Sequence, residues 1–403
     1  MRLEDVELHD PDLFARGLPH EALTTLRREA PVYFHREPGG RGFWAVTKYE
    51  DVVTVSKDPG RFSSHRGGTN IADYPPEDLS TIQLLMLNMD PPQHNKFRRL
   101  VSQGFTPRVI ARLEPRIRET AREILDAVAP IGHCDFVRSV AAELPLQVIA
   151  ELIGIPDEDR AKVFDWSNRL VGFDDPEFQT SLDDGKQAAM EMFMYANTLA
   201  EAGKGKSGDD LVSILMNGVV DGASLSEPEF DSFFLLMAVA GNETTRNLIA
   251  GGLLALIEHP EQRARLLADP SLIPMAVEEM LRWVTPVIHF RRTATQDTEL
   301  RGVPIKENDK VVVFYTSANR DEDVFPEPFE FDVGRNPNEH LAFGVGQHFC
   351  LGHNLARLEI RVMFEELLKR LPDMELAGPV RRLRSNFVNG FKEVPVRFTP
   401  SKT

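Results

Sequence analysis

The interpretation of this chain starts from one stretch of sequence, Phe343-Gly344-Val345-Gly346-Gln347-His348-Phe349-Cys350-Leu351-Gly352-His353-Asn354-Leu355-Ala356-Arg357. Glycines surround a single cysteine, Cys350, and a helical pattern begins directly after them. Glycine lets the backbone approach a flat ligand closely and adopts positive φ without steric cost. A lone cysteine is usually an inert buried side chain. Here, however, the amino end of the following helix and a bound metal would both favour the ionised sulfur, so the context predicts a metal-binding thiolate.

The fixed residues of this stretch resemble the haem-binding loop of the cytochrome P450 family, which reads F-G-x-G-x-H-x-C-x-G-x-x-L-A-R. Every fixed position is present. The resemblance implies that Cys350 is the axial iron ligand of haem b (iron protoporphyrin IX), a role in which a thiolate favours cleavage of the O–O bond. It also implies that Phe343 packs beside the cysteine, that His348 contacts a haem propionate and that Gly352 belongs to the cofactor-binding loop.

The composition of the chain argues against several other classes of protein. With 403 residues, a formal net charge of −16 and 42% hydrophobic residues, it indicates a soluble globular protein that does not bind nucleic acid, because nucleic-acid binders carry a basic surface. There are only two cysteines, Cys134 and Cys350, and no C-x-x-C pair, which argues against zinc ribbons, thioredoxin-like motifs and a disulfide framework. Length alone would allow two or three domains. The resemblance covers nearly the whole chain and implies one haem-thiolate domain over residues 1–403.

The N-terminal sequence and the longest apolar run indicate where the protein resides. The sequence MRLEDVELHDPDLF has neither the basic region nor the apolar region of a signal peptide. The longest apolar run, residues 233–241, is far shorter than the ~20 residues that span a bilayer. We therefore expect no membrane anchor and a cytoplasmic location.

Hydrophobic periodicity predicts a mainly helical protein with a smaller β region. Helical patterns cover residues 107–129, 140–153, 184–203, 226–259, 260–268, 271–284 and 352–371. Strand-like patterns cover residues 32–35 and 42–46, which a turn signal joins into a hairpin, and later 287–315 and 387–398, the last with a turn at Asn389-Gly390. The expected fold class is therefore α+β, and the resemblance implies the cytochrome P450 fold with a long central helix over the haem.

The helix predicted over residues 226–259 carries polar residues within an apolar run. Ser226 and Glu229 have capping-box spacing, and about 33 residues would give a helix of about 50 Å. Its centre reads Ala240-Gly241-Asn242-Glu243-Thr244-Thr245-Arg246. An exposed patch, or threonines that bond back to the helix, would explain these residues. The stretch also resembles the family motif A-G-x-[DE]-T-T, which implies that Ala240 and Gly241 leave room for dioxygen, Thr244 hydrogen-bonds the oxygen and Glu243 relays protons.

Two groups of charged residues gain meaning from the same resemblance. Glu279 and Arg282 match the family's E-x-x-R helix and Arg335 ends its meander, which implies a buried network that braces the haem loop in a structural role. Alone, an i,i+3 pair of this kind would be an ordinary surface ion pair. His94 and Arg98 match the family's helix-C pattern. These two residues, with Arg292 as a third, are the implied haem-propionate ligands.

A basic segment lies between His94 and Thr120. Its basic residues are Lys96, Arg98, Arg99, Arg108, Arg112, Arg116 and Arg118, against Glu114 and Glu119. Ordinary solvation of a helix face would explain the pattern. A docking face for an acidic electron donor would also explain it, since charge complementarity raises association rates. The chain has no nucleotide-binding G-x-G-x-x-G and no ferredoxin-type cysteine cluster, so the resemblance implies a separate ferredoxin and ferredoxin reductase as partners.

The resemblance implies an O2-dependent monooxygenase that hydroxylates an unactivated C–H bond of a small hydrophobic substrate. One oxygen atom enters the substrate and the other leaves as water. Three alternatives stay open. A peroxide-driven peroxygenase would lack the Glu243–Thr244 pair, and a haem-based gas-binding or sensor protein would need no proton relay. A cysteine hydrolase would need a base held by a third group, and His348 has no evident partner of that kind.

Apolar residues gather where this family lines its substrate pocket, which fits a hydrophobic substrate. They are Leu84, Leu85, Met86, Leu87, Met89, Val239, Val287, Ile288, Phe290, Phe387 and Val388. Residues 87–92, 239–247 and 382–386 resemble the actinobacterial sterol-oxidising branch of the family. A sterol or steroid side chain is therefore the expected substrate, with a terpenoid or a branched fatty acid as the alternative.

Overall fold

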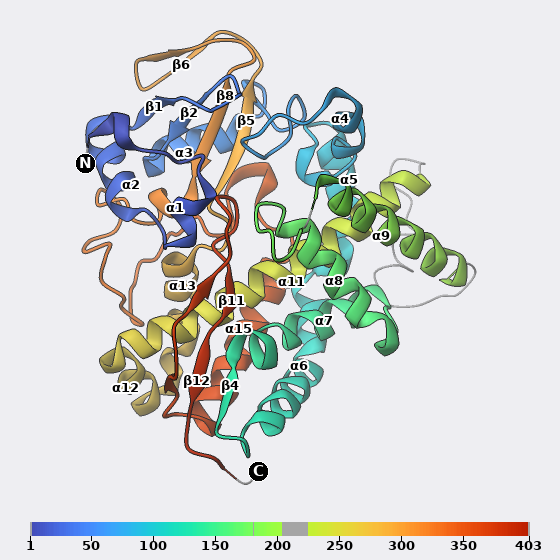
Figure 1. Cartoon of the computed structure of the whole chain (residues 1–403), viewed down its shortest axis with the longest axis vertical. Helices are drawn as coiled ribbons and strands as arrows, with labels where there is room; N and C mark the ends of the chain where they lie inside the picture. The colour runs from blue at the N-terminus through green and yellow to red at the C-terminus, as the bar shows by residue number, and fades with distance from the viewer. Residues whose placement is uncertain (1, 180, 204–224, 402–403) are drawn as a thin grey trace.

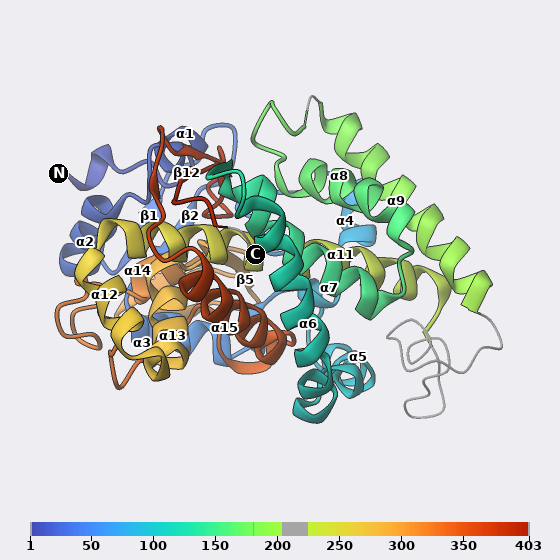
Figure 2. The same cartoon turned by 90° about the horizontal axis from the view of Figure 1, so that it is seen from below.

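The computed structural model describes residues 2–179, 181–203 and 225–401, and Figures 1 and 2 show their arrangement. The helices are α1 Pro11–Ala15, α2 His20–Glu29, α3 Tyr49–Lys57, α4 Pro76–Ile82, α5 Gln93–Val101, α6 Pro107–Val128, α7 Glu143–Ile153, α8 Arg160–Val171, α9 Leu182–Gly203, α11 Glu227–Glu258, α12 Pro260–Ala268, α13 Ile273–Val284, α14 Tyr315–Ala318 and α15 His353–Arg370. The strands are β1 Val32–His35, β2 Phe43–Val46, β3 Phe62–Ser63, β4 His133–Asp135, β5 His289–Ala294, β6 Thr298–Leu300, β7 Val303–Ile305, β8 Lys310–Phe314, β9 Glu375–Leu376, β10 Arg381–Arg382, β11 Phe391–Glu393 and β12 Pro395–Arg397. The predicted class, mainly α with a smaller β region, is confirmed.

The largest sheet has the strand order β1-β2-β8-β5-β3 and lies at the upper left of Figure 1. The predicted hairpin is present, because β1 and β2 pair antiparallel with Val32 opposite Val46. Strand β2 then pairs in parallel with β8, where Trp44 faces Val311. Strand β5 pairs antiparallel with both β8 and β3. The sheet therefore joins residues near the N-terminus to the segment that follows α13.

The C-terminal β segment differs in its pairing from the predicted single piece over residues 387–398. Strand β11 pairs with β10, whereas β12 lies between β4 and β9 in another sheet. The expected turn residue Asn389 donates its backbone N–H to the carbonyl of Pro286 at 2.9 Å. Val388 forms a single bridge with Val287. This loop is therefore held against the start of β5 rather than within a hairpin.

Helix α11 crosses the molecule and forms the centre of its helical part (Figures 1 and 2). It begins after Ser226, whose backbone N–H donates to Glu229 Oε2 at 2.9 Å, as the capping spacing predicts. It packs against α7, α8, α9, α13 and α15. Close crossing requires small residues: a Cβ at Gly251 would lie 2.8 Å from Val284, and one at Gly252 would lie 2.9 Å from Met280. The largest hydrophobic cluster of the protein is built around this helix.

The remaining predicted helices are present with small shifts at their ends. A π-helical turn over Val137–Ala141 precedes α7, and a 3-10 turn over Pro270–Leu272 precedes α13. Helices α1 to α5, α8 and α14 are additional to those that periodicity predicts. In the described part of the chain, no helix has the length and apolar character needed to cross a membrane.

Candidate active site

A large cavity lies between α11, the Cys350 loop and the start of α15, with about 1370 Å³ of empty space that is partly open to solvent. Most of its lining side chains are apolar, and α5 and the region before β5 complete the wall. The predicted site residues in the wall are His94, Arg98, Ala240, Gly241, Thr244, Phe343, His348, Cys350 and Gly352. Two predicted site residues, Glu243 and Arg292, do not line it. Predicted residues from three segments that are distant in the sequence, 94–98, 240–244 and 343–352, thus meet at one cavity.

The loop that carries Cys350 is closed by its own backbone. The Cys350 N–H donates to the Phe343 carbonyl at 2.9 Å. Gly344 and Gly346 have φ values of +69° and +79°, a region that favours glycine. At Gly346 a side chain would also lie 2.7 Å from the carbonyl oxygen of Ser56 on α3. The glycines therefore shape the turn and allow it to pack on a neighbouring helix.

The surroundings of the Cys350 thiol disfavour its ionised form. Burial raises the pKa of the thiol, and the Gly352 backbone N–H together with the charges of Arg98 and Arg357 only partly opposes that shift. A thiolate at this position therefore needs a metal ion to stabilise it. In the described residues, no group of three or more His, Cys, Asp or Glu side chains could hold a metal ion, so a metal at Cys350 would need donors from a cofactor.

Two histidines form a polar end of the cavity. The rings of His94 and His348 have centroids 4.2 Å apart. Burial lowers the pKa of both imidazoles, and for His348 the charge of Arg292 adds to the effect. Both ring nitrogens of His94 are buried without a hydrogen-bond partner in the described part of the chain. Unpaired buried donors of this kind indicate a site built for a polar ligand group.

Two arginines complete this end of the site. Arg98 donates to the carbonyls of Gln347 at 3.2 Å and Phe349 at 2.6 Å, so it joins α5 to the Cys350 loop. Arg292 is only 3% exposed and donates to the Arg291 carbonyl at 2.8 Å. No acidic side chain forms an ion pair with either arginine among the residues described. Their positive charges are therefore available to an anionic group.

The polar patch of α11 faces two directions. Thr244 lines the cavity, and its hydroxyl donates to the Ala240 carbonyl at 2.9 Å. The threonine thus both bonds back to its helix and faces the cavity, which were the two interpretations of the sequence. Gly241 has a packing role as well, because a Cβ there would lie 2.9 Å from Ile149 on α7.

Glu243 points away from the cavity into a buried ion pair with Arg246, one turn further along α11. Arg246 also donates to Asn168 on α8 at 2.9 Å, and its guanidinium lies 5.9 Å from the centre of the Phe164 ring. Burial raises the pKa of Glu243, and Arg246 opposes that shift. A proton relay from Glu243 to Thr244 would therefore require this ion pair to open.

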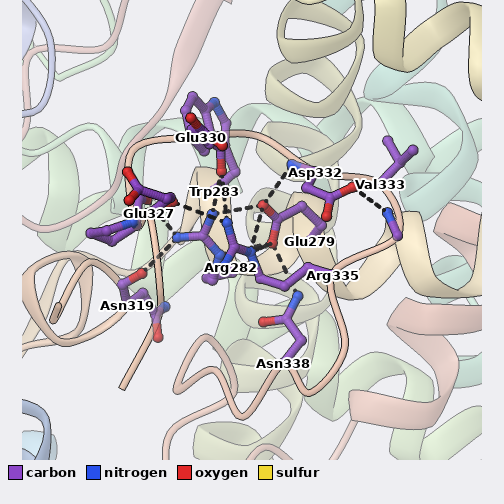
Figure 3. Close-up of polar contacts among 12 residues, drawn as sticks. Glu279, Arg282, Trp283, Asn319, Glu327, Glu330, Asp332, Val333, Arg335 and Asn338 are labelled. Carbon is purple, nitrogen blue, oxygen red and sulfur yellow. Dashed lines mark hydrogen bonds and ion pairs between the residues drawn. The ribbon is translucent and has the colours of Figure 1, made fainter. Parts of the chain in front are cut away.

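The predicted charge network behind the cysteine loop is present (Figure 3). Glu279 accepts from Arg282 at 2.6 and 2.7 Å and from Arg335 at 3.2 Å. The backbone N–H of Asp332 and the side chain of Asn338 each donate to it at 3.0 Å. The network ties α13 to residues 332–338, directly before the Cys350 loop, and has the structural role predicted for it.

Comparisons with known proteins agree with this geometry. The family profile for cytochrome P450 matches residues 267–372. A steroid C26-monooxygenase of Rhodococcus jostii is 45% identical, over 98% of this chain and 85% of the relative. A methyl-branched lipid omega-hydroxylase of Mycobacterium tuberculosis is 45% identical, over 98% and 95%. This chain belongs to the cytochrome P450 family. A Mycobacterium marinum cytochrome P450 in complex with pseudoionone has a TM-score of 0.89 at 41% identity, over 94% of each chain.

Membership of the cytochrome P450 family confirms several predictions. The fold is that of cytochromes P450, and the protein is a monooxygenase of the oxidoreductase class. The family implies a haem whose iron is bound by a cysteine thiolate. The relatives named above are oxygenases, so they support neither the sensor nor the cysteine-hydrolase alternative.

The residues of this cytochrome P450 fit such a haem. Cys350 offers the sulfur, and a Cβ added to neighbouring Gly352 would meet nothing within 4 Å, so space is open beside the cysteine. The unpartnered His94 nitrogens and the uncompensated Arg98 and Arg292 offer donors and positive charge for two propionates. The donor set therefore matches the sulfur-ligated iron and the acidic edge of the cofactor.

Three polar residues at the site carry no motif that predicts them. Tyr315, directly after β8, lines the cavity. Ser64 Oγ lies 3.3 Å from His348 Nε2. Glu359 on α15 also lines the cavity, and burial holds the pKa of its carboxyl well above the usual range. Only Glu359 has a sequence signal, because it stands within the apolar face formed by Leu355, Leu358 and Met363.

The apolar residues predicted for the substrate pocket divide into two groups. Met86, Leu87, Val287 and Phe290 line the cavity. The residues that do not line it are Leu84, Leu85, Met89, Val239, Ile288, Phe387 and Val388. Val239, Phe387 and Val388 pack instead into a separate small cluster with Val171 and Leu383. The additional wall residues Phe233, Leu236 and Met237 come from α11, about two to three turns before Thr244.

Proposed function

We propose that this cytochrome P450 binds haem b through Cys350 and hydroxylates the end of a methyl-branched alkyl chain, in the first place that of a steroid or sterol. The observation that carries the proposal is the Cys350 sulfur in the wall of a large apolar cavity whose polar end holds unpartnered donors. When bound, the haem supplies dioxygen activation. The proposal includes a single domain over residues 1–403 and a cytoplasmic location.

Each residue at the cofactor edge has a defined task in this proposal. His94, Arg98, Arg292 and His348 hold the propionates, since they gather where two histidine rings lie 4.2 Å apart and two arginines have no acidic partner among the described residues. Phe343 packs beside Cys350, to which its carbonyl is already hydrogen-bonded. Ala240 and Gly241 form the part of the α11 wall that leaves room for dioxygen.

Thr244 and Glu243 supply the protons. Thr244 faces the cavity with a hydroxyl that can hold a proton at Oγ1 and accept a further hydrogen bond. Glu243 is its sequence neighbour, and its pKa is raised by burial, which suits a carboxyl that must exchange protons near neutral pH. The ion pair with Arg246 has to open for this transfer.

The substrate assignment rests on the apolar cavity and on the relatives. The two relatives named above are a steroid C26-monooxygenase and a methyl-branched lipid omega-hydroxylase. Both names designate oxidation at the end of an alkyl chain. The apolar lining suits such a chain, and the empty space of about 1370 Å³, which includes open solvent, also has to hold the haem. A terpenoid is the second candidate, supported by the similar Mycobacterium marinum structure that contains pseudoionone.

An optical titration tests the proposal. The purified ferric protein is titrated in parallel with cholest-4-en-3-one, a terpenoid and a methyl-branched fatty acid, and the low-spin to high-spin shift is recorded. We expect the sterol or the branched fatty acid to give a saturable shift at lower concentration than the terpenoid. A shift with the terpenoid alone would replace the substrate assignment, and absence of haem absorbance would contradict the proposal itself.

We infer that the electron donor, a separate ferredoxin reduced by its reductase, docks on the outer face of α5 and α6. Arg116 and Arg118 are engaged in ion pairs with Glu119 and Glu114, and Arg98 turns inward to the Cys350 loop. Three exposed cations of the basic segment have no ion pair among the described residues: Lys96, Arg108 and Arg112. Because α5 contacts the Cys350 loop through Arg98, a donor on this face would come close to the haem.

Charge reversal tests this docking face. The triple variant Lys96→Glu, Arg108→Glu, Arg112→Glu should lower the ferredoxin-dependent reduction rate about tenfold at low salt, and the difference from wild type should shrink as salt rises. Lys162→Glu, at an exposed position on α8, is the control. Unchanged reduction by ferredoxin in the triple variant would contradict this docking face.

A further inference from the structure

A second acid–base cluster lies beside the Glu279 network and contacts both ends of the cysteine loop. Glu278 on α13 accepts from Arg357 Nε at 2.7 Å and from Nη2 at 2.8 Å, a two-pronged pairing. It also lies 3.1 Å from Nε2 of His340. His340 stands just before the loop and Arg357 just after it. Glu278 therefore joins both ends of the Cys350 segment to α13.

The Glu278–Arg357 pair reaches the cysteine through one aromatic ring. The Arg357 guanidinium lies 4.6 Å from the centre of the Phe343 ring, within cation–π range. Phe343 lines the cavity, and its carbonyl accepts the Cys350 N–H at 2.9 Å. The His340 ring also lies near Phe343, with the two ring centroids 6.1 Å apart. The Phe343 ring is thus contacted by Arg357, which does not line the cavity.

Arg357 differs from Arg98, the other cation close to the sulfur. Arg98 lines the cavity, where a propionate would compensate it. Arg357 is not in the cavity wall, and the acidic side chain paired with it in the described chain is Glu278. A bound propionate would therefore not neutralise the Arg357 charge, and Glu278 is the carboxylate that offsets part of it.

We propose that Glu278 and Arg357 are positioning residues that set the electron-donating strength of the Cys350 sulfur. Arg357 fixes the Phe343 ring against the loop and directs positive charge at the thiolate. Glu278 fixes Arg357 and offsets part of that charge. Positive charge near a thiolate stabilises the more electron-rich, reduced state of a metal bound to it, so Arg357 raises the reduction potential and Glu278 limits that rise. This inference rests on the proposed ligation of iron by Cys350.

The test is the reduction potential of the haem-loaded protein in four variants. Arg357→Gln should shift the ferric–ferrous equilibrium about tenfold toward the ferric form, about 59 mV for a one-electron couple. Glu278→Gln should shift it in the opposite direction, because Arg357 then acts uncompensated. Arg357→Lys keeps the charge without the planar stack, so its potential should lie between those of wild type and Arg357→Gln. The control is Arg361→Gln on the next turn of α15, which pairs with Glu114 and Glu365 and should leave the potential unchanged.

The outcomes separate this inference from the proposed function. Opposite shifts in Arg357→Gln and Glu278→Gln support it, since a merely structural role would lower stability in both without opposite changes in potential. Shifts of the same sign, or none, would overturn it. If Arg357→Gln loses its haem, the reduction potentials of Glu278→Gln and Arg357→Lys are compared with wild type instead. An unchanged potential in Glu278→Gln would then overturn the inference. A wild-type protein without a thiolate-ligated spectrum would instead overturn the proposed function.

Discussion

Two buried acid–base pairs in this protein have the same spacing and very different surroundings. Glu279–Arg282 on α13 and Glu243–Arg246 on α11 are both i,i+3 pairs, and none of the four residues is more than 4% exposed. Arg282 also donates to the carbonyls of Asn319, Pro328 and Glu330 at 2.8 to 3.1 Å (Figure 3). Arg246, in contrast, has Asn168 as its other hydrogen-bond partner, and its Nε is buried without one in the described chain.

Hydrogen-bond partners from distant segments, and not spacing or burial, therefore decide what such a buried acid–base pair does. Both carboxylate oxygens of Glu279 accept hydrogen bonds from more than one donor, so any rearrangement would leave a buried charge uncompensated, which costs several kcal/mol. Glu243 has few partners beyond Arg246, so its pairing can change at smaller cost. The Glu279–Arg282 pair, here called the saturated pair because it has many hydrogen-bond partners, braces the loop that carries Cys350. The Glu243–Arg246 pair, here called the sparse pair because it has few partners, lies next to Thr244, where the proposed reaction requires a proton.

The largest expected effect is on the saturated pair. Glu279→Gln should destabilise the protein by about 3–5 kcal/mol, because it leaves both Arg282 and Arg335 without their buried counter-charge. Denaturant unfolding and the fraction of haem retained after purification measure this. Arg265→Gln, which removes a cation from an exposed ion pair with Asp332, is the control and should cost less than about 1 kcal/mol. A Glu279→Gln protein as stable as that control would contradict the bracing role.

The sparse pair should show a smaller effect on folding and a larger one on turnover. Glu243→Gln is expected to cost about 1.5–3 kcal/mol, because it removes one charge-assisted hydrogen bond. Product formation should fall about tenfold or more if the carboxyl relays protons. Unfolding curves and steady-state turnover separate the two quantities. Full turnover in Glu243→Gln would remove this carboxyl from the proton path.

Thr244→Ala tests the cavity side of the same patch. The hydroxyl is bonded to its own helix, so its loss should change stability by less than about 1 kcal/mol. The substrate-induced spin shift should persist, while electrons are diverted from product to hydrogen peroxide. Peroxide and product are measured per NADH consumed, with Thr244→Ser as the variant that restores the hydroxyl. Wild-type coupling in Thr244→Ala would count against a role in oxygen protonation.

A further expected effect is a pH dependence of stability at Glu278. Burial alone would raise its pKa, but hydrogen bonds from His340 and Arg357 lower it to about 2 in the folded protein, from an ordinary value of 4.5. A depressed folded pKa contributes stability above pH 4.5 that is lost as the pH falls toward 2. The contribution is on the order of 2 kcal/mol. Unfolding free energies of wild type and Glu278→Gln should converge over this window, and parallel curves would contradict it.

Local patterns predicted much of the fold because they act over short distances. The cap at Ser226 and the hairpin of residues 32–35 with residues 42–46 depend on neighbouring residues, and both are present as predicted. The parallel pairing of Trp44 with Val311 could not be predicted from the chain alone, because it depends on two segments more than 250 residues apart. The same reason explains why the predicted C-terminal β piece divides between two sheets.

The site shows the same division. Motif spacing placed Cys350, Phe343 and His348 at one cavity, since these residues belong to one loop. It did not predict that Glu243 points away from the cavity, because residues three apart share a face but the choice of face depends on Asn168 and Phe164 of α8. Tyr315 was missed because it lies directly after a strand with no motif of its own.

The proposed function depends most on Cys350 as the iron ligand. The direct measurement is the absorption spectrum of the reduced, carbon-monoxide-treated protein, compared between wild type, Cys350→Ser and Cys134→Ser. Cys134 is the other free cysteine and serves as the matched control. We expect a thiolate-ligated spectrum in wild type and in Cys134→Ser. The same spectrum should be absent in Cys350→Ser. An unchanged spectrum in Cys350→Ser, or no thiolate-ligated spectrum in the wild type, would contradict it.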